Sequence, residues 1–228
     1  MSEEPSPVEE PYLGRESVYH LDRMIVVAME LSEAVAHWTR DNELSRLQGA
    51  ACQLIPHGFS IALSIRELIR TGYLLSAEIL VRPLIERAAV ISYLTKSKED
   101  VVSLWEQGWP YKSRPQLKQL MATMTEAPEE DVDLENEKVI IEHFNRLIHA
   151  DPLGSSRNVG STAEGLSGFL SGPNFSSPEI CDETCLVTIS CLVVLHARAT
   201  QLFPEAHIEG NIQDAHQIAK YLAAQRPE

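Results

Sequence analysis

The chain has 228 residues, 44% of them hydrophobic, which is enough for one large domain with a single core. Its formal net charge is −14, and so acidic a surface repels a phosphate backbone, so nucleic acid is not an expected partner. The first residues are acidic and proline-rich, unlike a signal peptide, and no apolar run reaches the roughly 18 residues of a membrane span. We therefore predict a cytoplasmic protein with no membrane contact and with four reduced cysteines.

The N-terminal part of the chain predicts a tail followed by two helices. Residues 1–11 hold three prolines and four glutamates and are expected to form a disordered acidic tail. Apolar residues then recur at spacings of three and four through Tyr12–Arg40, which predicts a long helix. Asp41 is the expected N-cap of the next helix, in which a kink or break is predicted just before Pro56, because proline lacks a backbone donor.

The segment Tyr73–Thr95 is apolar around almost its whole circumference. A helix of this kind is normally buried in the middle of a bundle. Pro83 lies in its interior and predicts a bend. We therefore expect a buried, proline-bent central helix.

Shorter helices are predicted after this central helix. Ser97–Asp100 resembles a capping box and opens a short helix through Gln107. Further helices are predicted over Gln116–Met124 and Leu134–His149.

The segment Asp151–Ser177 has a different composition, with five of the eleven glycines and seven serines. It is predicted to be a flexible loop, either a lid or partner-ordered segment or a simple connection. Ser177 and Pro178 then mark the start of a helix that extends to about Leu202. Asn211 is the expected cap of a last helix.

These elements predict an all-α fold: one domain over residues 12–228, built as a bundle of about six to eight helices around one buried, proline-bent central helix. No strand alternation is found in the sequence.

A polar stripe crosses the apolar central helix. Glu78, Arg82 and Glu86 are four residues apart and therefore share one face. Arg82 could bind a carboxylate or phosphate while Glu86 accepts a proton, so that the two line a polar pocket. Alternatively, the three charges form an ion-pair network that only fixes the helix register.

A second group of polar residues surrounds the end of the helix predicted at Leu134–His149. Asn145 and His149 share a face, and Asp151 follows in the turn, where it could orient the imidazole. Alternatively, His149 and Asp151 make a helix-ending hydrogen bond without chemistry. The candidate catalytic residues are Arg82, Glu86, Asn145, His149 and Asp151.

No cofactor or metal is predicted. Cys181 and Cys185 are one helical turn apart and could supply half a metal site, but no second pair with zinc-ligand spacing accompanies them. The chain also lacks a phosphate-binding glycine loop and the common hydrolase motifs.

Two segments carry a family resemblance. Arg82-Pro83-Leu-Ile-Glu86 and the later His149-Ala-Asp151-Pro152 resemble a bacterial family of helical domains of unknown function, over about Leu54–Pro152. That family is distantly similar to the HEPN domains, and the resemblance implies a helical fold and possible membership of a bacterial stress or phage-defence system.

Many HEPN proteins are dimeric, metal-independent ribonucleases whose motif is Arg, four to six residues, then His. The chain has one such match, Arg15 to His20, but about one is expected by chance in this composition. The leading hypothesis is therefore a non-catalytic interaction module that forms a homo-oligomer or binds a protein partner. The alternatives are a HEPN-like ribonuclease, for which nucleic acid would be a substrate, and a small-ligand sensor, both using a pocket at Arg82, Glu86 and His149.

Overall fold

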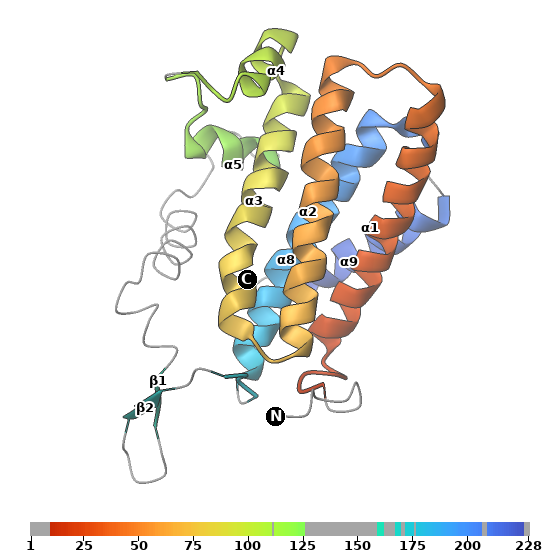
Figure 1. The fold of residues 1–228 in the computed structure, drawn as a ribbon. Coiled ribbons are helices and arrows are strands. Elements are labelled where there is room, and N and C mark those ends of the chain that lie inside the picture. The colour runs from red at the N-terminus through yellow and green to blue at the C-terminus, as the bar shows by residue number, and fades with distance from the viewer. Residues whose placement is uncertain are drawn as a thin grey trace.

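A computed structural model describes residues 10–110, 112–125, 159–161, 167–169, 172–175, 177–206 and 209–225. Within these ranges the chain forms seven α-helices, one short 3-10 helix and one two-stranded hairpin (Figure 1). The elements are α1 (Glu16–Asp41), α2 (Arg46–Arg70), α3 (Leu74–Lys96), α4 (Glu99–Glu106), α5 (Leu117–Thr125), β1 (Val159–Ser161), β2 (Ser167–Phe169), α8 (Pro178–Leu202), η4 (Pro204–Ala206) and α9 (Glu209–Ala224).

The predicted all-α bundle is confirmed. Helices α1, α2 and α3 stand side by side, with α8 and α9 packed behind them, while α4 and α5 lie at the end of the bundle where α3 finishes (Figure 1). The start of α1 contacts the start of α8 through Ser17 and Asp182, so these two helices run in the same direction. The end of α9 returns to the start of α1, where Tyr221 stacks on His20.

Helix α3 corresponds to the apolar helix predicted over Tyr73–Thr95. Eleven of its 23 residues are buried, compared with seven of the 26 residues of α1, so α3 contributes strongly to the core, while its place as the central helix stays a prediction. It packs against α2, α8 and α5. Pro83 lies inside the helix, which continues through it as one element, and the bend expected there stays a prediction.

Helix α8 supplies much of the remaining core. It begins at Pro178, immediately after Ser177, as the sequence predicts. In the part of the chain that the structure describes, it is the one helix whose length and mean hydropathy would allow it to cross a membrane. Its contacts with α1, α2, α3 and α9, and the burial of 11 of its 25 residues, account for its apolar composition as that of a core helix.

The predicted N-cap of α2 is wrong, and so is a break at Pro56. Asp41 is the last residue of α1, and the N-cap is Ser45, whose hydroxyl accepts from the Gln48 amide while the Gln48 side chain accepts from the Ser45 amide. This reciprocal capping box fixes the start of the helix. Pro56 does not break α2, because burial of one apolar side of the helix offsets the loss of a single backbone hydrogen bond, while the kink predicted as the other possibility stays a prediction.

Two other predicted caps are also wrong. Ser97 does not cap α4, because its hydroxyl donates backwards to the Tyr93 carbonyl, and the helix starts after Lys98 without a side-chain cap. Asn211 lies inside α9, where its amide donates to the Val27 carbonyl and its side-chain oxygen bonds His196. Tertiary partners on α1 and α8 therefore decide the role of Asn211.

The predicted tail and loop are partly described. Glu10 and Pro11 are the described part of the tail expected over residues 1–11, and the disorder of that tail stays a prediction. Within Asp151–Ser177, β1 and β2 pair antiparallel, and strands of three residues are too short to show alternation in the sequence. The flexibility of that segment stays a prediction, and the helix predicted at Leu134–His149 lies outside the described residues.

Helices α2 and α8 approach closely at Gly58. A Cβ atom added to Gly58 would lie 2.5 Å from Cδ1 of Leu195, which is fully buried on α8. Gly49, on the same helix, has nothing within 4 Å of the corresponding position. The two glycines therefore separate the effect of packing from the effect of helix propensity.

We expect Gly58→Ala to destabilise the protein by about 1–3 kcal/mol, because the new methyl group overpacks the contact with Leu195. Gly49→Ala should instead be neutral or stabilise by up to about 1 kcal/mol, because alanine is the better helix former. Urea unfolding of both variants measures the difference. Equal free energies of unfolding for the two variants would contradict the close approach of α2 and α8.

Candidate functional site

The described part of the predicted site is an ion pair on α3. Nε of Arg82 lies 3.5 Å from Oε1 of Glu86, and the two side chains are 30% and 42% exposed. Glu78, one turn before Arg82, is buried. The stripe therefore runs from a buried carboxylate to a partly exposed ion pair that a ligand can reach.

The other three predicted site residues, Asn145, His149 and Asp151, lie outside the described residues. Their approach to Arg82 and Glu86, on which the catalytic hypothesis depends, stays a prediction.

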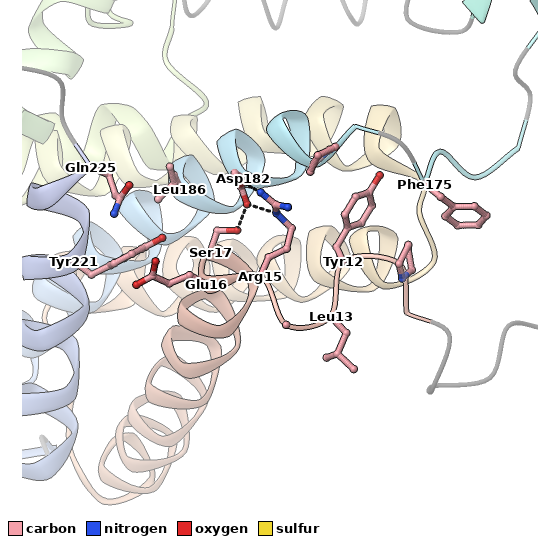
Figure 2. Close-up of a pocket in the computed structure, with 13 residues that line it drawn as sticks. Tyr12, Leu13, Arg15, Glu16, Ser17, Phe175, Asp182, Leu186, Tyr221 and Gln225 are labelled. Atoms are coloured by element: carbon pink, nitrogen blue, oxygen red, sulfur yellow. Dashed lines mark hydrogen bonds and ion pairs between the residues drawn. The ribbon is translucent and has the colours of Figure 1, made fainter. Parts of the chain in front are cut away.

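A polar cleft that sequence reasoning did not identify lies at the end of the bundle where α1 and α8 begin (Figure 2). It has a volume of about 670 Å³ and is formed by the turn before α1, the first turns of α8 and the end of α9. Its lining residues come from segments far apart in the sequence: Pro11, Tyr12, Leu13, Gly14, Arg15, Glu16, Ser17, Phe175, Pro178, Asp182, Leu186, Tyr221 and Gln225.

The centre of the cleft is a two-pronged pair between Arg15 and Asp182 (Figure 2). Nε of Arg15 donates to Oδ1 of Asp182 at 2.8 Å, Nη2 donates to Oδ2, and the Ser17 hydroxyl adds a third bond to Oδ1 at 2.5 Å. The Arg15 hydrogen bonds hold the pKa of Asp182 below its usual value, despite partial desolvation. The planar fork of Arg15 is thus fixed before any ligand arrives.

The turn that carries Arg15 is fastened at two more points. Nη1 of Arg66 on α2 lies 2.5 Å from Oε1 of Glu10, and both side chains are largely buried. Arg66 also makes a two-pronged pair with Asp22 on α1. The Tyr12 hydroxyl donates to the Asn174 carbonyl at 2.6 Å, so α1, α2 and the segment before α8 all hold this turn.

Tyr221 of α9 forms the wall of the cleft beside Glu16 (Figure 2). Its ring stacks on His20 with centroids 3.8 Å apart, and desolvation raises the pKa of its hydroxyl. His20 lies behind this wall, and burial lowers its pKa, so the imidazole is neutral at pH 7. In the Arg15 to His20 match to the HEPN motif, Arg15 therefore lines the cleft, whereas His20 packs against Tyr221 and does not line it.

Exposed apolar side chains lie on the rim of the cleft. Leu13 is 61% exposed and Phe175 is 58% exposed, and both line the cleft. Tyr19, on the outer face of α1, is 56% exposed. Leu13 and Phe175 therefore place exposed apolar surface beside a fixed pair of opposite charges, an arrangement suited to binding.

Within the described ranges, no group of three or more His, Cys, Asp or Glu side chains is placed to hold a metal ion. Cys181 and Cys185, the half-site considered from the sequence, are both buried free thiols on α8. Contact with Cys181 and burial raise the pKa of Cys185, so its thiol is protonated at neutral pH.

Comparison of the chain with known protein families, curated proteins and solved structures found no match. The resemblance based on Arg82, Pro83, Glu86 and His149 therefore stays a prediction.

We expect the stability contributed by Asp182 to depend on pH. Because its folded pKa lies below the unfolded value, the carboxylate stabilises the fold above about pH 4, and this stabilisation is lost as the pH falls through the folded pKa. Asp182→Asn should therefore be less stable than the parent protein at pH 7, and the difference should shrink as the pH falls below about 4. Urea unfolding across this range measures the effect.

Asp41→Asn, at the exposed end of α1, is the matched control and should change the free energy of unfolding at pH 7 much less than Asp182→Asn does. A stability difference for Asp182→Asn that does not change between pH 7 and pH 2.5 would contradict a stabilising carboxylate.

Proposed function

We propose that the chain is a non-catalytic helical interaction module that binds through the face around the polar cleft. The observation that supports this most is the exposure of Leu13 and Phe175 beside the fixed Arg15–Asp182 pair. Arginine and aromatic side chains are enriched where protein interfaces have their strongest contacts. Because Arg15 and Asp182 already hold each other, binding would cost little side-chain entropy at the centre of such an interface.

The partner that we propose first is a second copy of the chain. In a two-fold dimer, the same face is used by both copies, so that one self-complementary patch is enough. The patch must be self-complementary in charge, and Arg15 and Asp182 provide one charge of each sign. The alternative partner is another protein of a bacterial stress or defence system.

We expect the chain to be dimeric in light scattering and Leu13→Asp to shift it towards monomer, because a charge would be placed on the apolar rim. Added salt should strengthen the dimer, since each copy carries a net charge of −14.

Leu63→Asp is the control for this experiment, because Leu63 is an exposed leucine of α2 that does not line the cleft. It should leave the dimer intact. A monomeric parent chain at high concentration and high salt would reject self-association, and equal effects of the two substitutions would reject this face as the interface.

The alternative function is enzymatic, and its candidate catalytic residues are Arg82, Glu86, Asn145, His149 and Asp151. The partly exposed Arg82–Glu86 pair supports it, because a substrate phosphate could exchange with Glu86 on the arginine. In this reading, His149 is the general acid or base of a HEPN-like ribonuclease.

If this alternative holds, the purified chain should cleave RNA without added metal, and Arg82→Ala and His149→Ala should each lower the rate by at least about 100-fold. Arg87→Ala is the matched control, because Arg87 donates to the Pro83 carbonyl of its own helix. The same residual rate in all three variants would indicate a contaminating nuclease.

A cytoplasmic location and the absence of membrane contact stay expectations that accompany this proposal. The sensor alternative is also retained for the Arg82, Glu86 and His149 group, where its ligand would be anionic.

A further inference from the structure

A second cavity, of about 220 Å³, lies between α1, α2 and α8. Its walls are mainly apolar and share no residue with the polar cleft. The lining residues are Leu31, Ser32, Val35, Ala36, Thr39, Ala51, Cys52, Ile55, Pro56, Phe59, Ala199 and Phe203.

The cavity exists because each of the three helices presents a small side chain to it. Ala36 on α1, Ala51 on α2 and Ala199 on α8 leave space that larger residues would fill. The far wall is rigid, because Phe203 is 1% exposed and Trp38 packs edge-on against it at a centroid distance of 5.7 Å. Ala36 and Pro56 are exposed, so the cavity opens to solvent between α1 and α2.

Pro56, which lines this apolar cavity, removes one backbone hydrogen bond from α2. In an α-helix the amide of residue 56 would donate to the carbonyl of residue 52, but proline has no N–H. The carbonyl of Cys52 therefore lacks its regular helical donor. Cys52 and Pro56 both line the cavity, so this carbonyl lies in the stretch of α2 that forms one of its walls.

The other side-chain polar groups of the wall are the hydroxyls of Ser32 and Thr39 and the thiol of Cys52, and the last two offer little to a ligand. The Thr39 hydroxyl already donates to the Ala36 carbonyl at 3.1 Å. Desolvation raises the pKa of the Cys52 thiol, so it stays neutral at pH 7 and is a weak donor. Among the backbone carbonyls of the α2 residues in this wall, that of Cys52 is the one for which the helix supplies no regular donor.

We propose that this cavity binds a small planar, largely apolar molecule of one or two fused rings that carries one N–H or O–H donor, as indole and phenol do. An engineered apolar cavity of about 150 Å³ binds benzene, so a cavity of 220 Å³ has room for a somewhat larger ring system. The rings lie against Phe59 and Phe203, and the donor bonds the Cys52 carbonyl. This site is separate from the proposed interface, so either can fail without the other.

The first experiment compares indole with indene, which has the same shape but a CH₂ group in place of N–H. Both are titrated into the full chain by calorimetry. Indole should bind roughly three- to tenfold more tightly, although it is the less apolar of the two, because only indole makes the hydrogen bond. Failure of both to bind would overturn the proposal, and tighter binding of indene would overturn the role of the carbonyl.

Pro56→Ala tests the carbonyl directly. The new amide N–H supplies the helical hydrogen bond to the Cys52 carbonyl. Alanine has the highest helix propensity, so the variant should fold. It should bind indene as the parent chain does while losing the preference for indole. An indole preference that survives in Pro56→Ala would show that the ring donor bonds elsewhere.

A larger side chain that fills the cavity should abolish the binding of both indole and indene. Cys52→Phe places a ring in the cavity, and Gln53→Phe, at the next and exposed residue, is the matched control. Indole should bind the control but not Cys52→Phe, and binding by both variants would overturn the location.

Cys52 also supplies a readout that needs no variant. It is partly exposed while the other three cysteines are buried, so a thiol reagent should modify it first, and indole should slow that modification. N-acetyltryptophanamide, whose backbone amides exceed the cavity, should bind more weakly than indole. Tighter binding of this amide than of indole would indicate that the cavity binds a tryptophan side chain of a protein partner, and it would overturn the small-molecule proposal.

Discussion

Burial of α8 is the constraint on which the rest of the structure depends. This helix is too apolar to remain in water, and it is covered by α1, α2, α3 and α9 from different sides. Its first turn also carries Asp182, which bonds Arg15 and Ser17 and so fixes where α1 begins. Both candidate binding cavities include residues of α8, because each lies where a neighbouring helix meets it.

The contacts between α2 and α8 explain how a close-packed region and a cavity occur in one pair of helices. At Gly58 the helices approach so closely that Leu195 occupies the place of a side chain. Near Ala51 and Ala199 the side chains are too small to fill the space. A cavity of this kind costs the dispersion contacts that larger side chains would make.

Charged groups in this fold act mainly by joining segments that are distant in sequence. Arg66 holds Glu10 and Asp22, while Arg15 holds Asp182, and each pair is at least partly screened from water. These pairs fasten the chain that precedes α1 against α2 and α8. The polar cleft is therefore preorganised by the same interactions that hold the N-terminal turn in place, which couples stability to the proposed binding face.

The sequence by itself determined the helical class, the positions of most helices and the start of α8, because these follow from local spacing and from the Ser177–Pro178 pair. It also placed Arg82 and Glu86 on one face of a helix. Only the tertiary structure decided that Ser45 and not Asp41 caps α2, that Asn211 bonds α1 and α8, and that Arg15 meets Asp182, 167 residues away. Local patterns cannot determine such pairings, because a polar side chain bonds whichever partner the packing of apolar helices brings within reach.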